Sequence, residues 1–302
     1  MTKQIRLLGH ITITGEIEAL SGLHIGGTAD SIDKGGIDNP VIKNPVTNEP
    51  YIPGSSLRGR LRSLLEKKNG RPLSEMATGI WMEIYSKNSK SDELDESYSK
   101  AKESEVCRMF GNAQSNPGLP SILIVRDAHY TRTTREEGEF MQGGLPVTEA
   151  KMEIAVDRIT AQALPRTIER VPAGARFDFS IIYKVQTDDV AQFDIVTGND
   201  ALKQDLKHIL WALEEIETHD GLGGNTSRGH GQVKFHLRSF VVRDFVNVVN
   251  DKVKIKQPTE AQLKAAKTAK YIDDLTDYLF EDFQTEIDTI AFSISSNAGE
   301  HA

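Results

Sequence analysis

Alternating apolar and polar positions near the start of the chain predict its first strand. Within residues 10–20, Ile11, Ile13, Ile17 and Ala19 all fall on one parity. A period of two is typical of a strand that buries one face. Three later segments are short, apolar and rich in β-branched or aromatic residues, and they predict further strands over 121–130, 176–185 and 232–240.

A helical spacing of apolar residues predicts two amphipathic helices. Over residues 53–68, four leucines recur at positions i, i+4, i+7 and i+8, namely Leu57, Leu61, Leu64 and Leu65. A second helix is predicted over residues 201–216. Its apolar residues share one face and are Leu202, Leu206, Ile209, Leu210, Leu213 and Ile216.

The order of these elements predicts the fold class. Strand, helix, strand, strand, helix, strand is the split βαβ order of the α+β ferredoxin-like, or RRM-like, fold. We expect one such domain over residues 1–245, with large insertions at about 21–54, 69–105 and 128–176. Long connections inside a compact domain are usually functional or disordered. Residues 246–302 are expected to form a helical, acidic C-terminal extension.

Charge is distributed unevenly along the chain. The 302 residues include 36 Lys and Arg against 44 Asp and Glu, and a net charge of −8 at first disfavours a nucleic-acid partner. Residues 271–302 hold eight of the acidic residues and no Lys or Arg, so the other 270 residues carry 36 charges of each sign. Within residues 53–72, only Glu66 opposes a basic cluster of Arg58, Arg60, Arg62, Lys67, Lys68 and Arg71. Such a cluster is typical of a phosphate-binding surface.

Composition also limits the compartment and the chemistry. Residues 1–10 hold no apolar run of signal-peptide length, and no stretch approaches the roughly 18 apolar residues of a membrane span. We therefore expect a cytoplasmic protein with no membrane partner. Cys107 is the sole cysteine, which excludes a disulfide or a Cys-based zinc site within one chain.

Residues 22–62 combine glycine pairs with a basic helix. The pairs at 26/27 and 35/36 permit backbone to approach a ligand closely, and the helix that begins near Ser55 and Ser56 offers free N–H groups to a phosphate. Arg58 and Arg62 lie at i and i+4, where both could flank one RNA backbone. Helix capping by the two serines and a solvated helix face are the plain alternatives.

Two further segments have the composition of RNA-binding elements. Residues 221–233 place five glycines around Ser227, Arg228 and His230, which suits a phosphate-binding nest, although the segment lacks the Walker A pattern. Residues 149–177 mix apolar side chains with Lys151, Arg158, Arg166, Arg170 and Arg176, which suits an arm that contacts RNA. A flexible connection and an ordinary exposed hairpin are the respective alternatives.

Catalytic candidates remain open at this point. Asp38 lies between a glycine pair and an Asn-Pro pair, where its carboxylate could bind a divalent metal or orient a ribose 2′-OH. An aspartate in this position is also an ordinary turn former, and Asp30 and Asp33 are equally plausible. His24 and His230 could act as general bases, although a lone histidine is more often structural.

Taken together, these segments resemble the RAMP superfamily, and closely the repeated backbone subunit of type III-A (Csm) CRISPR effectors. Over residues 22–233 the resemblance runs through GLHIGG, GGIDNPVIKNPVTNEPYIPGSSLRGRLRSLLE, RMFGNA, TEAKMEIAVDRITAQALPRTIERVPAGARF and GLGGNTSRGHGQV. It implies a subunit that stacks into a filament of its own copies, holds guide RNA (crRNA) in a palm and projects a thumb hairpin that interrupts pairing with target RNA. The target would be cut at each interruption.

The resemblance also implies roles and partners. It places the metal-dependent cleavage aspartate on Asp38, with a divalent cation, Mg²⁺ or Mn²⁺, as cofactor. It implies RNA contacts by His24, Gly26, Gly27, Ser55, Ser56, Arg58, Arg62, Lys151, Arg158, Arg166, Gly223, Gly224 and Arg228. Further implied partners are a large polymerase-like subunit, a small subunit and RAMP subunits that cap the 5′ and 3′ ends of the guide.

Two other functions fit the same residues. One is a related backbone subunit that holds guide RNA without cutting it, and the other is a metal-independent guide-processing endoribonuclease that uses His24 or His230. The chain also departs from the family pattern in residues 69–105, in everything beyond about 245, and in Arg58, where a lysine is more usual. The acidic tail is expected to pack on the core or on a neighbouring subunit, or to repel RNA from the filament's outer face.

Overall fold

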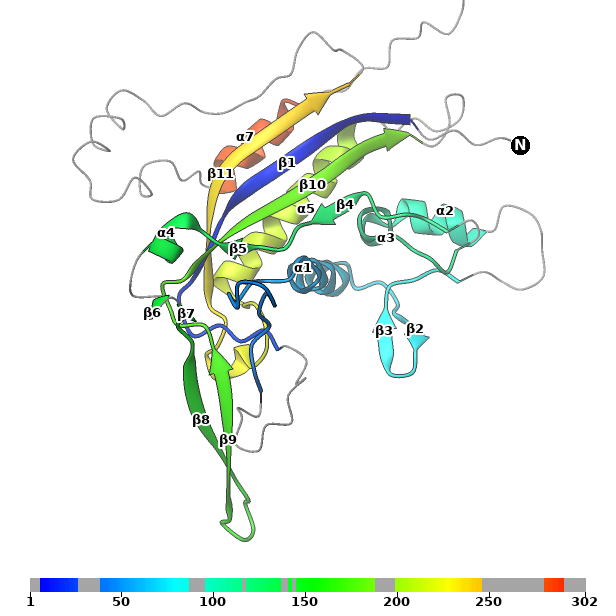
Figure 1. Ribbon diagram of the computed structural model, residues 1–302. Coiled ribbons are helices and arrows are strands. Elements are labelled where there is room, and N and C mark those ends of the chain that lie inside the picture. Colours follow the sequence, from blue (N-terminus) through cyan, green and yellow to red (C-terminus); the bar gives the residue numbers. More distant parts are fainter. Residues whose placement is uncertain are drawn as a thin grey trace, which may run out of the picture.

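The computed structural model describes residues 6–26, 39–86, 96–115, 118–136, 141–142, 145–187, 199–245 and 280–290. Its central feature is an antiparallel sheet with the strand order β11-β1-β10-β4 (Figure 1). β1 (Arg6–Ala19) lies between β10 (Arg176–Thr187) and β11 (Val233–Asp244). β10 also pairs with β4 (Leu123–Val125) and β5 (His129–Tyr130).

The alternation along β1 decides which face of the sheet is buried. Ile11, Ile13 and Ile17 are at most 1% exposed, whereas Thr12 and Thr14 on the other face are only partly buried. Full burial of an isoleucine side chain stabilises the fold by roughly 1.5–3 kcal/mol relative to an exposed one. The predicted strand is confirmed, and it begins four residues earlier than expected.

Two helices complete the core. α1 (Gly54–Asn69) buries Leu57, Leu61 and Leu65, and α5 (Asn199–Thr218) buries its predicted apolar face in the same cluster as the odd-numbered residues of β1. Both helix predictions are confirmed. Among the described residues, neither α5 nor any other helix has the length and apolar composition required to cross a membrane.

The start of α1 differs from the prediction. Its N-cap is Pro53, whose ring cannot accept a hydrogen bond, and Ser55 and Ser56 lie inside the first turn. Instead, the carboxylate of Asp127 accepts the Gly54 N–H at 2.7 Å. The prediction that a serine caps this helix is therefore wrong, because a side chain 73 residues away supplies the cap.

The segment 121–130 also differs from the prediction of one strand. It forms β4 and β5, which are separated by residues 126–128. Ala128 exchanges two backbone hydrogen bonds, of 2.8 and 2.9 Å, with Ile52 and not with β10. The strand is interrupted because this stretch turns away from β10 to meet the chain that leads into α1.

The insertions form elements of their own. The insertion at 69–105 contains the hairpin of β2 (Ser74–Ala77) and β3 (Ile80–Met82), the helix α2 (Glu96–Glu103) and the first residue of α3 (Glu105–Phe110). The connection from β5 to β10 contains α4 (Arg132–Glu136) and the short pair β6 (Met141–Gln142) and β7 (Leu145–Pro146). It continues into the long hairpin of β8 (Glu149–Val156) and β9 (Ala163–Arg170), which projects from the body (Figure 1).

The described part of the C-terminal extension docks on the core. α7 (Phe280–Asp288) lies beside α5 and β11, with Phe283 and Ile287 at most 1% exposed. The Phe283 ring meets Phe240 of β11 edge-on, with 5.4 Å between the ring centroids, and Lys207 of α5 pairs with Asp288 at 2.7 Å. The other helical runs predicted in this extension lie outside the described residues.

Candidate functional site

A groove runs between α1 and the glycine loop of residues 221–231, and we call it the α1 groove. Its volume is about 440 Å³, and its lining residues are Ile25, Gly26, Ser56, Gly59, Arg60, Ser63, Gly223 and Gly224. Three segments that are far apart in the sequence therefore meet here. Four predicted site residues, Gly26, Ser56, Gly223 and Gly224, lie together in this groove.

Backbone hydrogen bonds hold the glycine loop against residues 22–26. The Gly224 N–H donates to the His24 carbonyl at 2.8 Å, and the Gly231 N–H donates to the Gly22 carbonyl at 3.0 Å. Gly223 has a φ of +79°, and a Cβ there would collide with the His24 carbonyl oxygen. The loop can lie this close to residue 24 only because glycine accepts the left-handed conformation and has no side chain.

The helix presents small residues and one arginine to the groove. Ser56, Gly59, Arg60 and Ser63 are spaced i, i+3, i+4 and i+7, so they share one face of α1. The Arg60 guanidinium lies 3.2 Å from Asp220 and 3.4 Å from the Gly223 carbonyl. Arg60 was expected only as a member of the basic cluster of residues 53–72 and not among the RNA contacts. The spacing of small and polar residues on this helix face is the signal that could have singled it out.

Arg58 and Arg62 lie on the far side of α1 from the groove. Arg58 donates to the Phe110 carbonyl at 2.6 Å and to the Ser121 hydroxyl at 3.2 Å, and its guanidinium stacks over the Phe110 ring. Burial, and then the neighbouring charge of Arg62, lowers the pKa of Arg58. RNA binding by these two arginines stays a prediction, and it would require each guanidinium to serve protein and RNA together.

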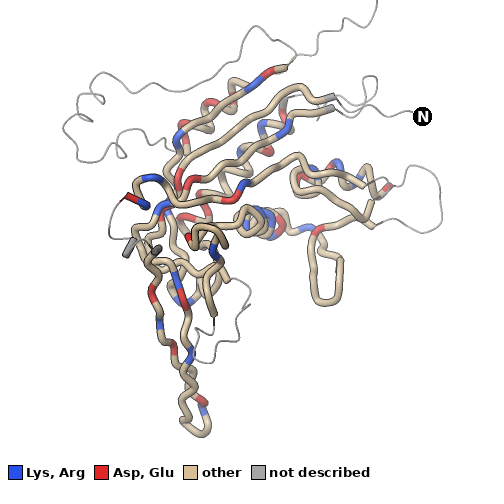
Figure 2. Tube along the Cα trace, in the orientation of Figure 1, with Lys and Arg blue, Asp and Glu red and all other residues tan. Residues whose placement is uncertain are grey.

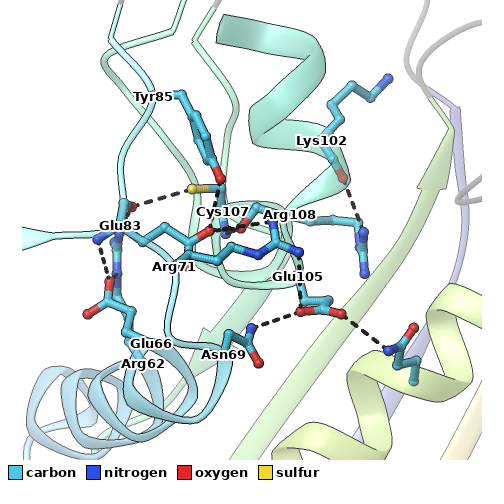
Figure 3. A network of polar contacts seen from close by, with 12 residues as sticks. Arg62, Glu66, Asn69, Arg71, Glu83, Tyr85, Lys102, Glu105, Cys107 and Arg108 are labelled. Atoms are coloured by element: carbon cyan, nitrogen blue, oxygen red, sulfur yellow. Dashed lines mark hydrogen bonds and ion pairs between the residues drawn. The ribbon is translucent and has the colours of Figure 1, made fainter. Parts of the chain in front are cut away.

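Arg62 belongs to a polar network that fastens the insertion to α1 (Figure 3). Its guanidinium donates to Glu66 and to the Glu83 carbonyl, each at 2.8 Å, and the Glu83 N–H donates to Glu66 at 3.1 Å. The buried Glu83 carboxylate accepts the Ser104 hydroxyl at 2.5 Å. Burial raises the pKa of the nearby Cys107 thiol to about 11, so this cysteine is held as a neutral, unreactive thiol.

His24 lies under the edge of the groove and is only 9% exposed. Its Nδ1 is 2.6 Å from the Glu169 carbonyl oxygen, which can only accept, so Nδ1 carries the proton. In the neutral ring, Nε2 is then a hydrogen-bond acceptor. It lies beside Gly26 of the groove, 3.7 Å from the position that a Cβ on Gly26 would occupy. The histidine thus joins the groove to the base of the β8–β9 hairpin.

The Glu169 carboxylate is the best-satisfied buried acid near the groove. It accepts the Val41 N–H at 2.9 Å, the Lys43 ammonium at 2.6 Å and the Thr148 hydroxyl at 2.6 Å. Burial by itself would raise the pKa of this carboxyl, but the hydrogen bonds from Lys43, Thr148 and Val41 outweigh it and the pKa is lowered. Glu169 is therefore held as a carboxylate, and the sequence analysis did not single it out.

Asp38, the predicted cleavage residue, lies outside the described residues, as do Gly27, Asp30 and Asp33. The next residue, Asn39, is described and forms a bridge with Ile168. No group of three or more metal-binding side chains occurs within the described ranges. Mg²⁺ commonly uses one or two carboxylates together with substrate phosphates, so a single aspartate beside RNA is sufficient protein ligation.

The predicted basic residues of the hairpin divide between its base and its tip. Near the base, Lys151 lies 3.1 Å from His230, and Arg166 pairs with Glu153 at 2.8 Å. Arg158 lies in the exposed turn between β8 and β9, where Ile159 is 95% exposed. Acidic and basic residues are interspersed along the hairpin (Figure 2), so its positive charge is largely paired.

The remaining predicted residues do not line the α1 groove. Ser55 is exposed in the first turn of α1, and Arg228 is exposed in the short 3₁₀ turn Thr226–Arg228, where it donates to Asn225 at 2.6 Å. His230 is 1% exposed and touches Glu153 and Lys151. Burial, then Lys151, lowers the pKa of His230, although its hydrogen bond to Glu153 acts in the opposite direction.

Comparison with known proteins identifies the family. A family model described as the RAMP superfamily matches residues 16–234, which include the α1 groove and the whole β8–β9 hairpin. The chain belongs to the RAMP superfamily. The resemblance noted from the motifs is thereby confirmed.

RAMP relatives with a stated activity are similar over most of the chain. A protein from Enterococcus italicus named CRISPR system Cms endoribonuclease Csm3 is 35% identical over 237 residues, which are 78% of this chain and 94% of that protein. A protein of the same name from Methanothermobacter thermautotrophicus is 36% identical over 249 residues, 76% of this chain and 85% of that protein.

A solved RAMP structure supports the fold. The crystal structure of Methanopyrus kandleri Csm3 superposes with a TM-score of 0.54 at 22% sequence identity, and covers 94% of this chain and 97% of that one. The mixed α+β architecture predicted for this chain is therefore confirmed.

Proposed function

We propose that this RAMP protein is the guide-RNA-binding backbone subunit of a type III-A CRISPR complex and an endoribonuclease that cuts target RNA. The α1 groove is the observation that carries the proposal, because it brings residues 25–26, the helix α1 and the glycine loop together on one surface. Similarity over three quarters of the chain to proteins named CRISPR system Cms endoribonuclease Csm3 supports the activity.

The groove suits an RNA backbone and not a single base. The glycines leave room for a sugar-phosphate backbone, and Ser56 and Ser63 bring hydroxyl groups to the groove. Arg60 adds a guanidinium at the rim of the loop, where it also pairs with Asp220 at 3.2 Å. Contacts of this type bind phosphate and sugar without reading sequence. We assign guide-RNA contact first to Gly26, Ser56, Gly223 and Gly224, and extend it to Gly59, Arg60 and Ser63.

Cleavage is assigned to Asp38. Its carboxylate would orient the ribose 2′-OH of the unpaired nucleotide and accept its proton, so that the 2′-oxygen attacks the adjacent phosphate. The bond from phosphorus to the 5′-oxygen of the next nucleotide breaks, the 5′-oxygen takes a proton from water, and a 2′,3′-cyclic phosphate forms. A divalent cation, Mg²⁺ or Mn²⁺, held by Asp38 and phosphate oxygens would supply positive charge to that phosphate. The hairpin tip, with Arg158 and exposed Ile159, is the part suited to holding the nucleotide out of the stack.

The test is target-RNA cleavage by reconstituted complex that carries Asp38→Ala, with Asp33→Ala in the same loop as the matched control. We expect Asp38→Ala to lower cutting by at least about a hundredfold, since it removes the group that activates the nucleophile. Asp33→Ala should cut like the wild type, and a chelator should abolish cutting by the wild type and by Asp33→Ala. If Asp38→Ala cuts at the wild-type rate, Asp38 is not the cleavage residue, and only the guide-binding part of the proposal remains.

The metal-independent alternative finds less support in the geometry. His230 is buried against Glu153 and Lys151, and the His24 ring is fixed by Glu169. A general base must reach the proton that it abstracts. Cutting that persists in chelator and is lost in His24→Ala would favour this alternative.

The wider assembly is part of the proposal. The βαββαβ order and the sheet order β11-β1-β10-β4 support a ferredoxin-like core. Copies of this chain would stack into a filament in the cytoplasm along guide and target RNA. The large polymerase-like subunit, the small subunit and the guide-capping RAMP subunits would complete the complex.

A further inference from the structure

The described residues before and after Asp38 pair with each other. Residues 23–26 precede it in the sequence, and residues 39–43 follow it. The Ile42 N–H donates to the Ile25 carbonyl at 2.9 Å, and Gly26 bridges Val41. We call these two backbone segments, together with residues 168–171 at the end of β9 and just after it, the loop neck.

The end of β9 binds both sides of this neck. Leu23 and Val171 exchange two backbone hydrogen bonds, of 2.9 and 2.8 Å. On the other side, the Glu169 N–H donates to the Asn39 carbonyl at 3.0 Å, and Asn39 bridges Ile168. The base of the β8–β9 hairpin is thus hydrogen-bonded to the segments on both sides of Asp38.

Glu169 makes the contacts that join the hairpin to residues 23–26 and to residues 39–43. Its carbonyl accepts the His24 Nδ1–H on one side of the neck, and its carboxylate accepts the Val41 N–H and pairs with Lys43 on the other. The residue is 4% exposed. Loss of one partner of a buried, multiply bonded carboxylate leaves groups unpaired, so these contacts resist rearrangement.

We propose that Glu169 is a positioning residue for target cleavage, which fixes the loop bearing Asp38 relative to the hairpin that interrupts the RNA duplex. The inference rests on the proposed function. Asn39, whose carbonyl accepts the Glu169 N–H, is bonded directly to Asp38, so the anchor lies one residue from the cleaving group. Glu169 itself acts through the backbone and through Lys43, and does not touch RNA.

The experiment uses the reconstituted complex with Glu169→Gln, which keeps the size of the side chain but loses its charge. We expect cleavage to slow by about tenfold, since small misplacement of a reacting group has large effects on rate. The cut sites should also spread to phosphates neighbouring each normal position. Guide-RNA content should stay unchanged, and the Val41 amide should exchange hydrogen faster.

A matched control separates positioning from general loss of stability. Asp205 is another buried carboxylate, 0% exposed and bonded to Arg108 and Tyr183 on the opposite side of the core. Asp205→Asn should lower the melting temperature while the cut sites stay sharp. The inference would be overturned if the cut sites of Asp205→Asn spread to neighbouring phosphates as much as those of Glu169→Gln. It would also be overturned if Glu169→Gln cut at the wild-type rate and at the wild-type positions.

A second variant covers a failure of Glu169→Gln to fold or assemble. Lys43→Gln removes the other half of the 2.6 Å ion pair and leaves Glu169 in place. Lys43→Gln should slow cleavage and spread the cut sites as Glu169→Gln does. The variant with both substitutions should cut little more slowly than either single variant, because the two residues form one ion pair. Sharp, fast cutting by Lys43→Gln would overturn the inference. Wild-type complex that does not cut would instead refute the proposed function itself.

Discussion

At the scale of single residues, arginines close together on α1 serve opposite sides of the helix. Arg60 faces the α1 groove, whereas Arg58 and Arg62 bond to α3 and to the insertion. Because these arginines are close together in the sequence, they were predicted to form one phosphate-binding surface. The helical turn separates them. Arg58 and Arg62 donate to the carbonyls of Phe110 and Glu83, whereas Arg60 pairs with Asp220 and contacts the Gly223 carbonyl at the groove.

Arg60→Gln tests the groove at this scale. Loss of one phosphate contact should weaken binding of single-stranded RNA by about three- to tenfold and reduce the slope of log affinity against log salt by roughly 0.7. Lys67→Gln is the matched control, since Lys67 is an exposed cation on the same helix outside the groove. RNA titrations at several salt concentrations measure both quantities. An equal loss of affinity in the two variants would show that only net charge matters.

At the scale of elements, α1 serves the core and the groove with different faces. Leu57, Leu61 and Leu65 are buried, and the face with Ser56, Gly59, Arg60 and Ser63 is kept free of bulk. Among the described residues, no heavy atom lies within 4 Å of where a Cβ on Gly59 would stand. Glycine destabilises a helix, and no packing contact requires it at this position. Its effect here is to keep the groove open.

Substitutions at Gly59 separate these two effects. Gly59→Ala should raise the free energy of unfolding by roughly 0.5–1 kcal/mol, because alanine loses less backbone entropy in a helix. RNA affinity should change little. Gly59→Glu should fold equally well but weaken RNA binding by at least about tenfold, since it adds bulk and negative charge to the groove. Denaturation and RNA titration of both variants check this, and tight RNA binding by Gly59→Glu would remove the groove from the RNA path.

At the scale of the whole molecule, the described part of the acidic extension belongs to the core. Phe283, Ile287 and Ile290 join the same cluster as the buried residues of β1 and α5. Of the roles expected for this tail, packing on the chain's own core is confirmed for residues 280–290. Packing on a neighbouring subunit and repulsion of RNA stay predictions.

Phe283→Ala measures how much α7 stabilises the fold. A cavity in place of a buried aromatic ring should lower the free energy of unfolding by about 3–5 kcal/mol. Glu281→Ala, in the exposed first turn of the same helix, is the control and should change it by less than about 0.5 kcal/mol. Urea denaturation of the two variants supplies the comparison. A stability loss no larger for Phe283→Ala than for the control would mean that α7 does not dock in solution.

The sequence by itself determined the main elements of the core and the family. Local periodicity in β1, α1 and α5 was sufficient, because burial of one face depends on spacing along a single segment. The motifs likewise identified the RAMP superfamily and most of the segments that line the groove. Asp38 was selected by motif position alone and stays a prediction.

Only the tertiary structure decided which polar side chains meet. Asp127 caps α1, Arg60 and not Arg58 faces the groove, and Glu169 joins the hairpin to the loop neck. Each of these contacts spans from 73 to 163 residues of sequence. Hydrogen bonds and ion pairs act over a few ångströms between groups that the fold brings together, so the spacing of residues along one segment cannot specify them.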